Sequence, residues 1–162
     1  MNSSLDGRTA LVTGAGRGIS RGIALGLAQS GARVGLLART GHEIDDACAE
    51  IHDAGGTAVA LAADVSDPEQ TRIAVERLVD EFGHVELLVN NAAVVWPLGP
   101  TQDVDPAAHP GMLAGLNTYA TSKGALEAHT LNLAAELEGT GVTANVYRPG
   151  TVGRHLDASV HQ

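Results

Sequence analysis

Short apolar runs alternate with longer amphipathic stretches along most of this chain. The runs are rich in Val, Leu and Ala and carry few charges, as is typical of strands buried on both faces of a parallel sheet. They occupy residues 8–14, 32–39, 57–64, 85–91 and 142–147. Parallel strands need crossover connections, which helices supply, so the alternation predicts an α/β fold with a doubly wound parallel sheet.

The clearest helix signal begins at Asp67. Asp67 can cap a helix, Pro68 stands at the first helical position, and Gln70 completes a capping box. An apolar stripe follows at helical spacing, and Gly83 ends the pattern. The stripe consists of Val75, Leu78, Val79 and Phe82.

Composition narrows the class of protein. A chain of 162 residues predicts one domain spanning 1–162, and 44% hydrophobic but only 2% aromatic residues predict an aliphatic core. A net charge of −9 disfavours nucleic acid and anionic membranes as partners. Cys48 is the only cysteine, which fits a reducing, cytoplasmic compartment, and from the first residues we expect no leader or membrane anchor. The seven histidines have no metal-ligand spacing, so no metal is expected.

A glycine-rich loop, "TGAGRGIS" at residues 13–20, lies between the first predicted strand and a helix. Glycines allow a tight turn and a close approach of the backbone to a pyrophosphate, whose charge is attracted by the amides that begin the helix. The strand and helix around the loop favour a dinucleotide site over an ordinary turn.

The loop resembles the Thr-Gly-x-x-x-Gly-x-Gly signature of short-chain dehydrogenases/reductases, with Thr13, Gly14 and Gly18 in register. Ser20 replaces the final glycine. This serine adds a side chain where helix and strand pack closely, and is therefore expected to weaken the fit of the cofactor without forbidding it.

The end of the second strand indicates which dinucleotide is preferred. An acidic residue there would accept the ribose 2′-hydroxyl of NAD, but the sequence has Ala38 and then Arg39. Arg39, together with Arg17 in the loop, favours a 2′-phosphate and hence NADP in preference to NAD. The alternative is that Arg39 is a solvated charge at the end of a strand.

Further family marks follow in order: "ADV" at 63–65, "NNAA" at 90–93, "YATSK" at 119–123 and "RPGTV" at 148–152. The resemblance implies that Tyr119 is the catalytic acid/base and that Lys123 supports it and holds the nicotinamide ribose. A solvated tyrosine-lysine pair four residues apart is the alternative for these two positions taken alone. The cofactor contacts that the resemblance implies are Gly14, Arg17, Gly18, Ile19, Arg39, Asp64, Val65, Asn91, Ala92, Tyr119, Lys123, Pro149 and Gly150.

The family pattern breaks between "NNAA" and "YATSK". Residues 94–118 contain four of the six prolines and no serine, although family members carry a long helix and a strand ending at a catalytic serine there. We therefore predict an irregular connector over 94–118, a frayed tail over 153–162, and a family member that is internally deleted and C-terminally truncated. With one strand missing, the expected sheet order is 3-2-1-4-6, the last strand being residues 142–147.

Three functions remain open at this stage. The first is hydride transfer between NADP(H) and a small carbonyl or alcohol, impaired by the missing serine and substrate loop. The second is dinucleotide binding without catalysis, and the third is a truncated copy without activity. The apolar face of the last helix, formed by Leu126, Leu133 and Leu137, is also a candidate homo-oligomer interface.

Overall fold

The computed structural model describes residues 5–93, 116–140 and 142–147, with the side chains of its last helix described from residue 123 onward. These residues belong to two units, residues 1–93 and 94–162. The first unit holds every strand that the described residues form, together with three helices.

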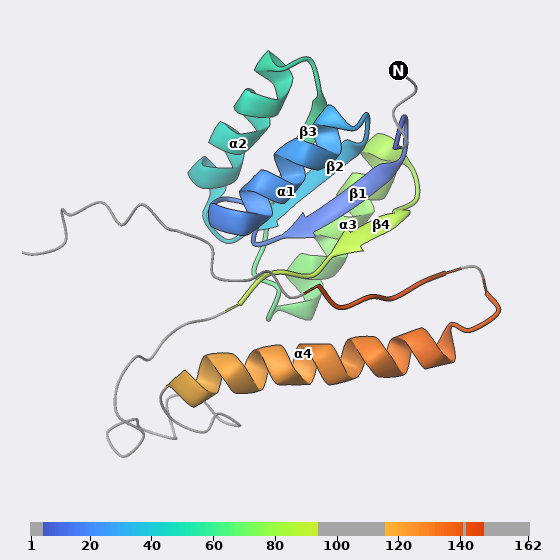
Figure 1. Ribbon diagram of the computed structural model, residues 1–162. Coiled ribbons are helices and arrows are strands. Elements are labelled where there is room, and N and C mark those ends of the chain that lie inside the picture. The colour runs from blue at the N-terminus through green and yellow to red at the C-terminus, as the bar shows by residue number, and fades with distance from the viewer. Residues whose placement is uncertain (1–4, 94–115, 141, 148–162) are drawn as a thin grey trace, which may run out of the picture. The chain divides into compact units, whose positions relative to one another are not determined.

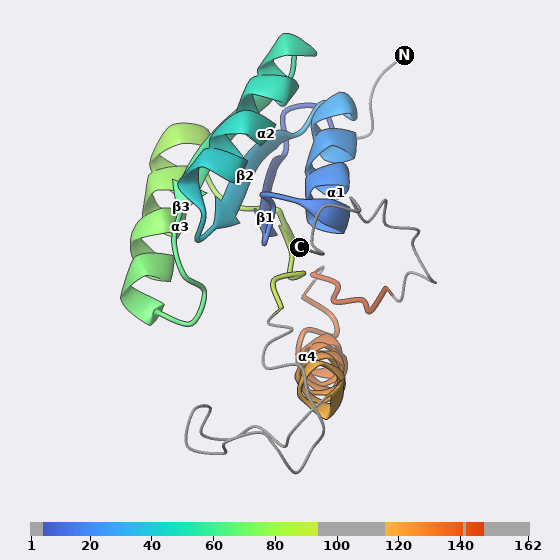
Figure 2. The same ribbon diagram turned by 90° about the vertical axis from the view of Figure 1, so that its left-hand side faces the viewer.

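The first unit is a parallel sheet with helices on both faces, as Figures 1 and 2 show. The strands run in the spatial order β3-β2-β1-β4, so the doubly wound α/β class and the order of these four strands are confirmed. The strands are β1 (Thr9–Thr13), β2 (Arg33–Ala38), β3 (Thr57–Ala62) and β4 (Leu87–Val89). The helices are α1 (Gly18–Gln29), α2 (Gly41–Asp53) and α3 (Pro68–Phe82).

Successive side chains of β1 enter two separate cores, because neighbouring residues of a strand point to opposite faces. Ala10 and Val12 pack in the cluster that includes the buried residues of α1 and α2. Leu11 packs in the cluster formed with Leu78 of α3. Both cores are built mainly from aliphatic residues, as the composition predicted.

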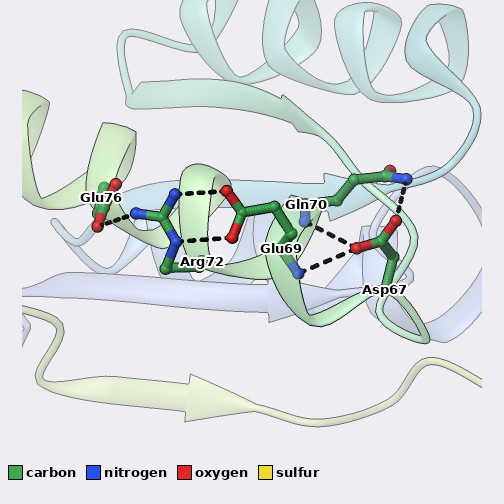
Figure 3. A network of polar contacts seen from close by, with 5 residues as sticks. All are labelled: Asp67, Glu69, Gln70, Arg72 and Glu76. Carbon is green, nitrogen blue, oxygen red and sulfur yellow. Dashed lines mark hydrogen bonds and ion pairs between the residues drawn. The ribbon is translucent and has the colours of Figure 1, made fainter.

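The start of α3 confirms the predicted cap but not the predicted capping box (Figure 3). The Asp67 carboxylate accepts hydrogen bonds from the backbone N–H groups of Glu69 and Gln70 at 3.0 and 3.1 Å. Gln70 does not return a bond to the Asp67 N–H, which donates to the carbonyl of Asp64 instead. The Gln70 side chain donates to the Asp67 carboxylate at 2.8 Å and accepts from the backbone N–H of Asp64 at 3.1 Å. The cap of α3 therefore also fixes the backbone at Asp64.

The exposed face of α3 carries a small charge network next to this cap (Figure 3). Arg72 donates two hydrogen bonds to Glu69, at 2.9 and 2.6 Å, and another to Glu76 one turn further on. All three side chains are solvent-exposed, so we read the network as a solvated helix face and not as a site.

The α3 cap makes a testable contribution to stability. Its hydrogen bonds to Gln70 are the main cause of a lowered pKa for Asp67. A carboxyl whose pKa is lowered by folding stabilises the protein above its unfolded pKa of about 4, and this contribution is lost as the pH falls through the lower folded value. Asp67→Ala is expected to lower the melting temperature at pH 7 by about 2–4 °C.

Asp67→Asn is the matched control for that prediction, since asparagine caps helices well but does not titrate in this range. Thermal melts at several pH values should show Asp67→Asn close to the wild type at pH 7, with a weaker loss of stability in acid. Equal melting temperatures for Asp67→Ala and the wild type at pH 7 would show that the cap is not stabilising.

The described part of the second unit is dominated by α4 (Leu116–Glu136). This helix begins before Tyr119, so the last three residues of the expected connector are helical, while residues 94–115 lie outside the described residues. The expected strand at 142–147 is wrong, because these residues are described and form no strand. Val142 and Tyr147 are 57% and 84% exposed. A strand requires a hydrogen-bonded neighbour, which a short apolar run by itself cannot supply.

Candidate functional site

The glycine-rich loop joins the carboxyl end of β1 to the first turn of α1. Gly14 has a φ of +68°, in the left-handed region that side chains disfavour. A Cβ at this position would lie 3.1 Å from the Cα of Ala92, so Gly14 also allows a close approach of two backbones. The N–H groups of Gly14 and Ala15 donate to the carbonyl of Leu37 at 2.7 and 3.2 Å, which fixes the loop to the end of β2.

The start of α1 is favourable for an anion. Arg17 is the residue before the helix, has an exposed side chain, and makes no side-chain capping bond. The first turn contains no acidic residue, so the partial positive charge of the helix terminus is not neutralised from within the helix. Gly18 has a φ of +61° and Ile19 is 39% exposed, which leaves an apolar surface beside the loop.

Thr13 connects the ends of β1 and β4. Its hydroxyl oxygen accepts hydrogen bonds from the backbone N–H groups of Asn91 and Ala92, both at 3.1 Å, and its hydroxyl donates to the carbonyl of Val89 at 3.3 Å. The structure thus brings the "TG" and "NNAA" segments together at one edge of the sheet. In an open α/β sheet, ligands bind at the carboxyl edge where the strand order reverses, and here that point lies between β1 and β4.

Ser20, the residue that departs from the family glycine, is accommodated in this edge. It is 1% exposed, and its hydroxyl oxygen accepts a hydrogen bond from the side-chain amide of Asn91. The serine therefore links the first turn of α1 to the segment after β4. Ser20 was recognised as a departure from the family signature, but nothing in the sequence indicated its hydrogen-bond partner.

The link between Ser20 and Asn91 can be tested by a double-mutant cycle. Ser20→Ala is expected to lower the free energy of unfolding by about 0.5–1.5 kcal/mol, the usual net value of one such hydrogen bond. Urea denaturation of Ser20→Ala, Asn91→Ala and the double variant should show that the two single losses are not additive. Strict additivity would contradict the link.

Arg39 and Asp64, predicted separately, lie close together. Arg39 follows β2 directly, and its guanidinium lies 3.7 Å from the Asp64 carboxylate. Hydrogen bonds from the backbone and hydroxyl of Ser66 are the largest causes of the lowered pKa of Asp64, and the charge of Arg39 adds to them. Arg39 is 68% exposed, so its ion pair with Asp64 is weak and another anion can readily replace Asp64 as its partner. Val65 beside it is 47% exposed.

Tyr119 and Lys123 lie on one uninterrupted helix, α4, as their spacing predicted. Lys123 is half-buried, and this burial lowers the pKa of its ammonium group. The side chain of Tyr119 lies outside the described side chains, and Pro149 and Gly150 lie outside the described residues. The structure therefore confirms a shared helix for the pair, and their catalytic role stays a prediction.

Two other expectations concern metals and membranes. Within residues 5–93, 116–140 and 142–147, no three His, Cys, Asp or Glu side chains gather as a metal site would require. In the same parts of the chain, no helix has the length and apolar character needed to cross a bilayer.

Comparison with known protein families shows which family carries this arrangement of loop and strands. The model of the short chain dehydrogenase family matches residues 8–113, which include the glycine-rich loop, both strands beside it and the "NNAA" segment. The chain belongs to the short-chain dehydrogenase family. Members of this family are oxidoreductases that bind NAD or NADP.

Two relatives show how much of a short-chain dehydrogenase is present. The chain is 40% identical over 129 residues to the hydroxysteroid dehydrogenase-like protein 2 of Danio rerio, covering 74% of this chain and 31% of that protein. It is 31% identical over 194 residues to a short chain dehydrogenase of Pseudocercospora fijiensis, covering 95% of this chain and 62% of that protein. The chain thus spans less than two thirds of the length of these relatives.

The second alignment agrees with the expected internal deletion. Its 194 residues exceed the 162 residues of the whole chain. The relative therefore carries residues within the aligned stretch that have no counterpart here.

A solved structure gives the same family. A metagenomic short-chain oxidoreductase, solved in complex with NADP, superposes with a TM-score of 0.81 at 29% identity, covering 93% of this chain and 85% of that one. The fold and family rest on this likeness together with the sequence match.

Proposed function

We propose that this short-chain dehydrogenase binds NADP(H) at the carboxyl edge between β1 and β4. The observation that carries the proposal is the backbone at Gly14, which is left-handed and lies so close to Ala92 that a side chain would fill the space. This turn sets the end of β1 tightly against the segment after β4, and the start of α1 that follows the turn attracts the negative charge of a pyrophosphate.

The residues around the glycine-rich loop are suited to bind the separate parts of the dinucleotide. The amides at the start of α1 and the exposed Arg17 would hold the pyrophosphate. Arg39 would exchange its pairing with Asp64 for the 2′-phosphate of NADP, since an exposed ion pair is weak. Asp64 and Val65 would contact the adenine, as the family resemblance implies.

The chemistry that we propose is hydride transfer between the cofactor and a small carbonyl or alcohol. The bound nicotinamide supplies the hydride. Tyr119 would hold and transfer the proton at the substrate oxygen, and Lys123 on the same helix would favour the charged form of the phenol by its own charge. Because residues 94–118 contain no serine to donate a hydrogen bond to that oxygen, we expect a rate reduced by about 10²–10³-fold.

The missing serine also favours a second candidate function, namely dinucleotide binding without catalysis. A truncated copy without activity is the third. A cytoplasmic location, no role for nucleic acid, membrane or metal, and a homo-oligomer formed through α4 stay predictions with this proposal.

An assay of NADPH consumption with a panel of small ketones and aldehydes separates these candidates, run on chain shown to be monodisperse by size exclusion. Slow turnover that requires one class of carbonyl would support the reductase. Saturable NADPH binding without turnover would favour the binding protein, and aggregation without binding would favour the inactive copy.

A further inference from the structure

Glu43 lies against the glycine-rich loop, although no motif includes it. It belongs to the first turn of α2 and is half-buried. A Cβ at the buried Gly16 would lie 2.7 Å from Oε2 of Glu43 and 2.8 Å from its Cβ. Only a glycine therefore leaves room for this side chain, and the Glu43 carboxylate rests on the backbone of the loop.

The carboxylate of Glu43 has no hydrogen bond or ion pair within the described part of the chain. Two other glutamates of the same unit are bonded: Glu50 accepts from Arg21 at 2.8 Å, and Glu86 accepts from the backbone N–H of Thr9 at 3.1 Å. The Glu43 oxygens are not among the buried unpartnered atoms of the described residues, so solvent reaches them and a bound ligand with hydroxyl groups can donate a hydrogen bond to them.

We propose that Glu43 is a specificity-determining residue that opposes Arg39 in the choice of dinucleotide. This inference rests on the proposed binding of a dinucleotide at the loop. The Glu43 carboxylate accepts a hydrogen bond from a hydroxyl of the adenosine ribose, as acidic residues do in NAD sites, and repels a phosphate on that ribose. Arg39 attracts the same phosphate, so the preference between NADPH and NADH is a balance of the two residues.

The test is the ratio of the dissociation constants for NADH and NADPH, measured by fluorescence titration of the purified full chain. Glu43→Gln keeps the shape of the side chain and removes its charge. The preference for NADPH should rise about tenfold, as expected for the loss of one charge close to a phosphate in a partly solvated site. Arg39→Ala should move the ratio in the opposite direction.

Asp46→Asn is the matched control, because Asp46 is an exposed acid of the same helix, about one turn after Glu43. It removes the same charge from the molecule and should leave the ratio near that of the wild type. Circular dichroism melts should show that both variants fold as the wild type does.

Two results would overturn the inference, and they are distinguishable. If the wild type binds both nucleotides but Glu43→Gln shifts the ratio no more than Asp46→Asn, Glu43 does not determine specificity and the proposed function stands. If the folded wild type binds neither nucleotide, the proposed function fails and this inference fails with it.

Discussion

Replacing Gly14 with valine is expected to abolish dinucleotide binding, with a loss of affinity of at least about 100-fold. The φ of +68° at Gly14 is strained for any side chain and most strongly for a β-branched one. The new Cβ would also lie 3.1 Å from Cα and 3.3 Å from N of Ala92, and backbone atoms cannot swing aside as a flexible side chain can. The loop would have to move away from its position at the ends of β1 and β4. Titration with NADPH would show the resulting loss of affinity.

Gly26→Ala is the control for this variant. Gly26 lies in the middle of α1, is exposed, and has nothing within 4 Å of the added Cβ. Alanine there should leave the affinity unchanged and raise the free energy of unfolding by up to about 1 kcal/mol, through helix propensity. Wild-type affinity in Gly14→Val, in a chain with the wild-type circular dichroism spectrum, would contradict the assignment of the loop.

Tyr119→Phe is expected to reduce any NADPH-dependent carbonyl reduction by about 10²–10⁴-fold, the usual contribution of a positioned acid/base. The ring remains, and only the phenolic hydroxyl with its exchangeable proton is lost. Cofactor binding through the glycine-rich loop should therefore persist in this variant. Turnover and NADPH affinity measured on the same preparation separate the two effects.

Tyr147 offers a matched control, since it is the other tyrosine of the chain and its side chain is 84% exposed. Tyr147→Phe should leave turnover and NADPH affinity unchanged. If Tyr119→Phe retains full turnover, the proton comes from another group and the family role does not transfer to this residue.

The elements that the sequence predicted best are those with strong local signals. All four apolar runs up to residue 91 contain strands, most completely in β1 and β2, which are apolar and mostly buried between two layers of helices. The strand β4 covers only Leu87–Val89 of the run at 85–91 and is partly exposed. The cap at Asp67 was likewise encoded by adjacent residues. Residues 142–147 show the limit of this reasoning, since they also form a short apolar run but the structure describes no strand there.

The site was only partly predictable, because its parts come from segments far apart in the chain. Family marks identified Thr13, Arg39, Asp64 and Asn91 singly, yet their pairing depends on the register of β1 with β4 and of β2 with β3. The hydrogen bond between Ser20 and Asn91 joins residues 71 positions apart. The contact of Glu43 with Gly16 depends on how α2 leaves the sheet, for which the sequence offers no signal.

Our claim is that the edge between β1 and β4 binds a dinucleotide, and a fluorescence titration of the folded full chain with NADPH and then NADH measures that binding. We predict saturable binding that prefers NADPH, with a preference that falls when Arg39 is replaced by alanine and binding that is lost in Gly14→Val. A monodisperse, folded chain that binds neither nucleotide would contradict the claim, and the family resemblance would then record ancestry alone.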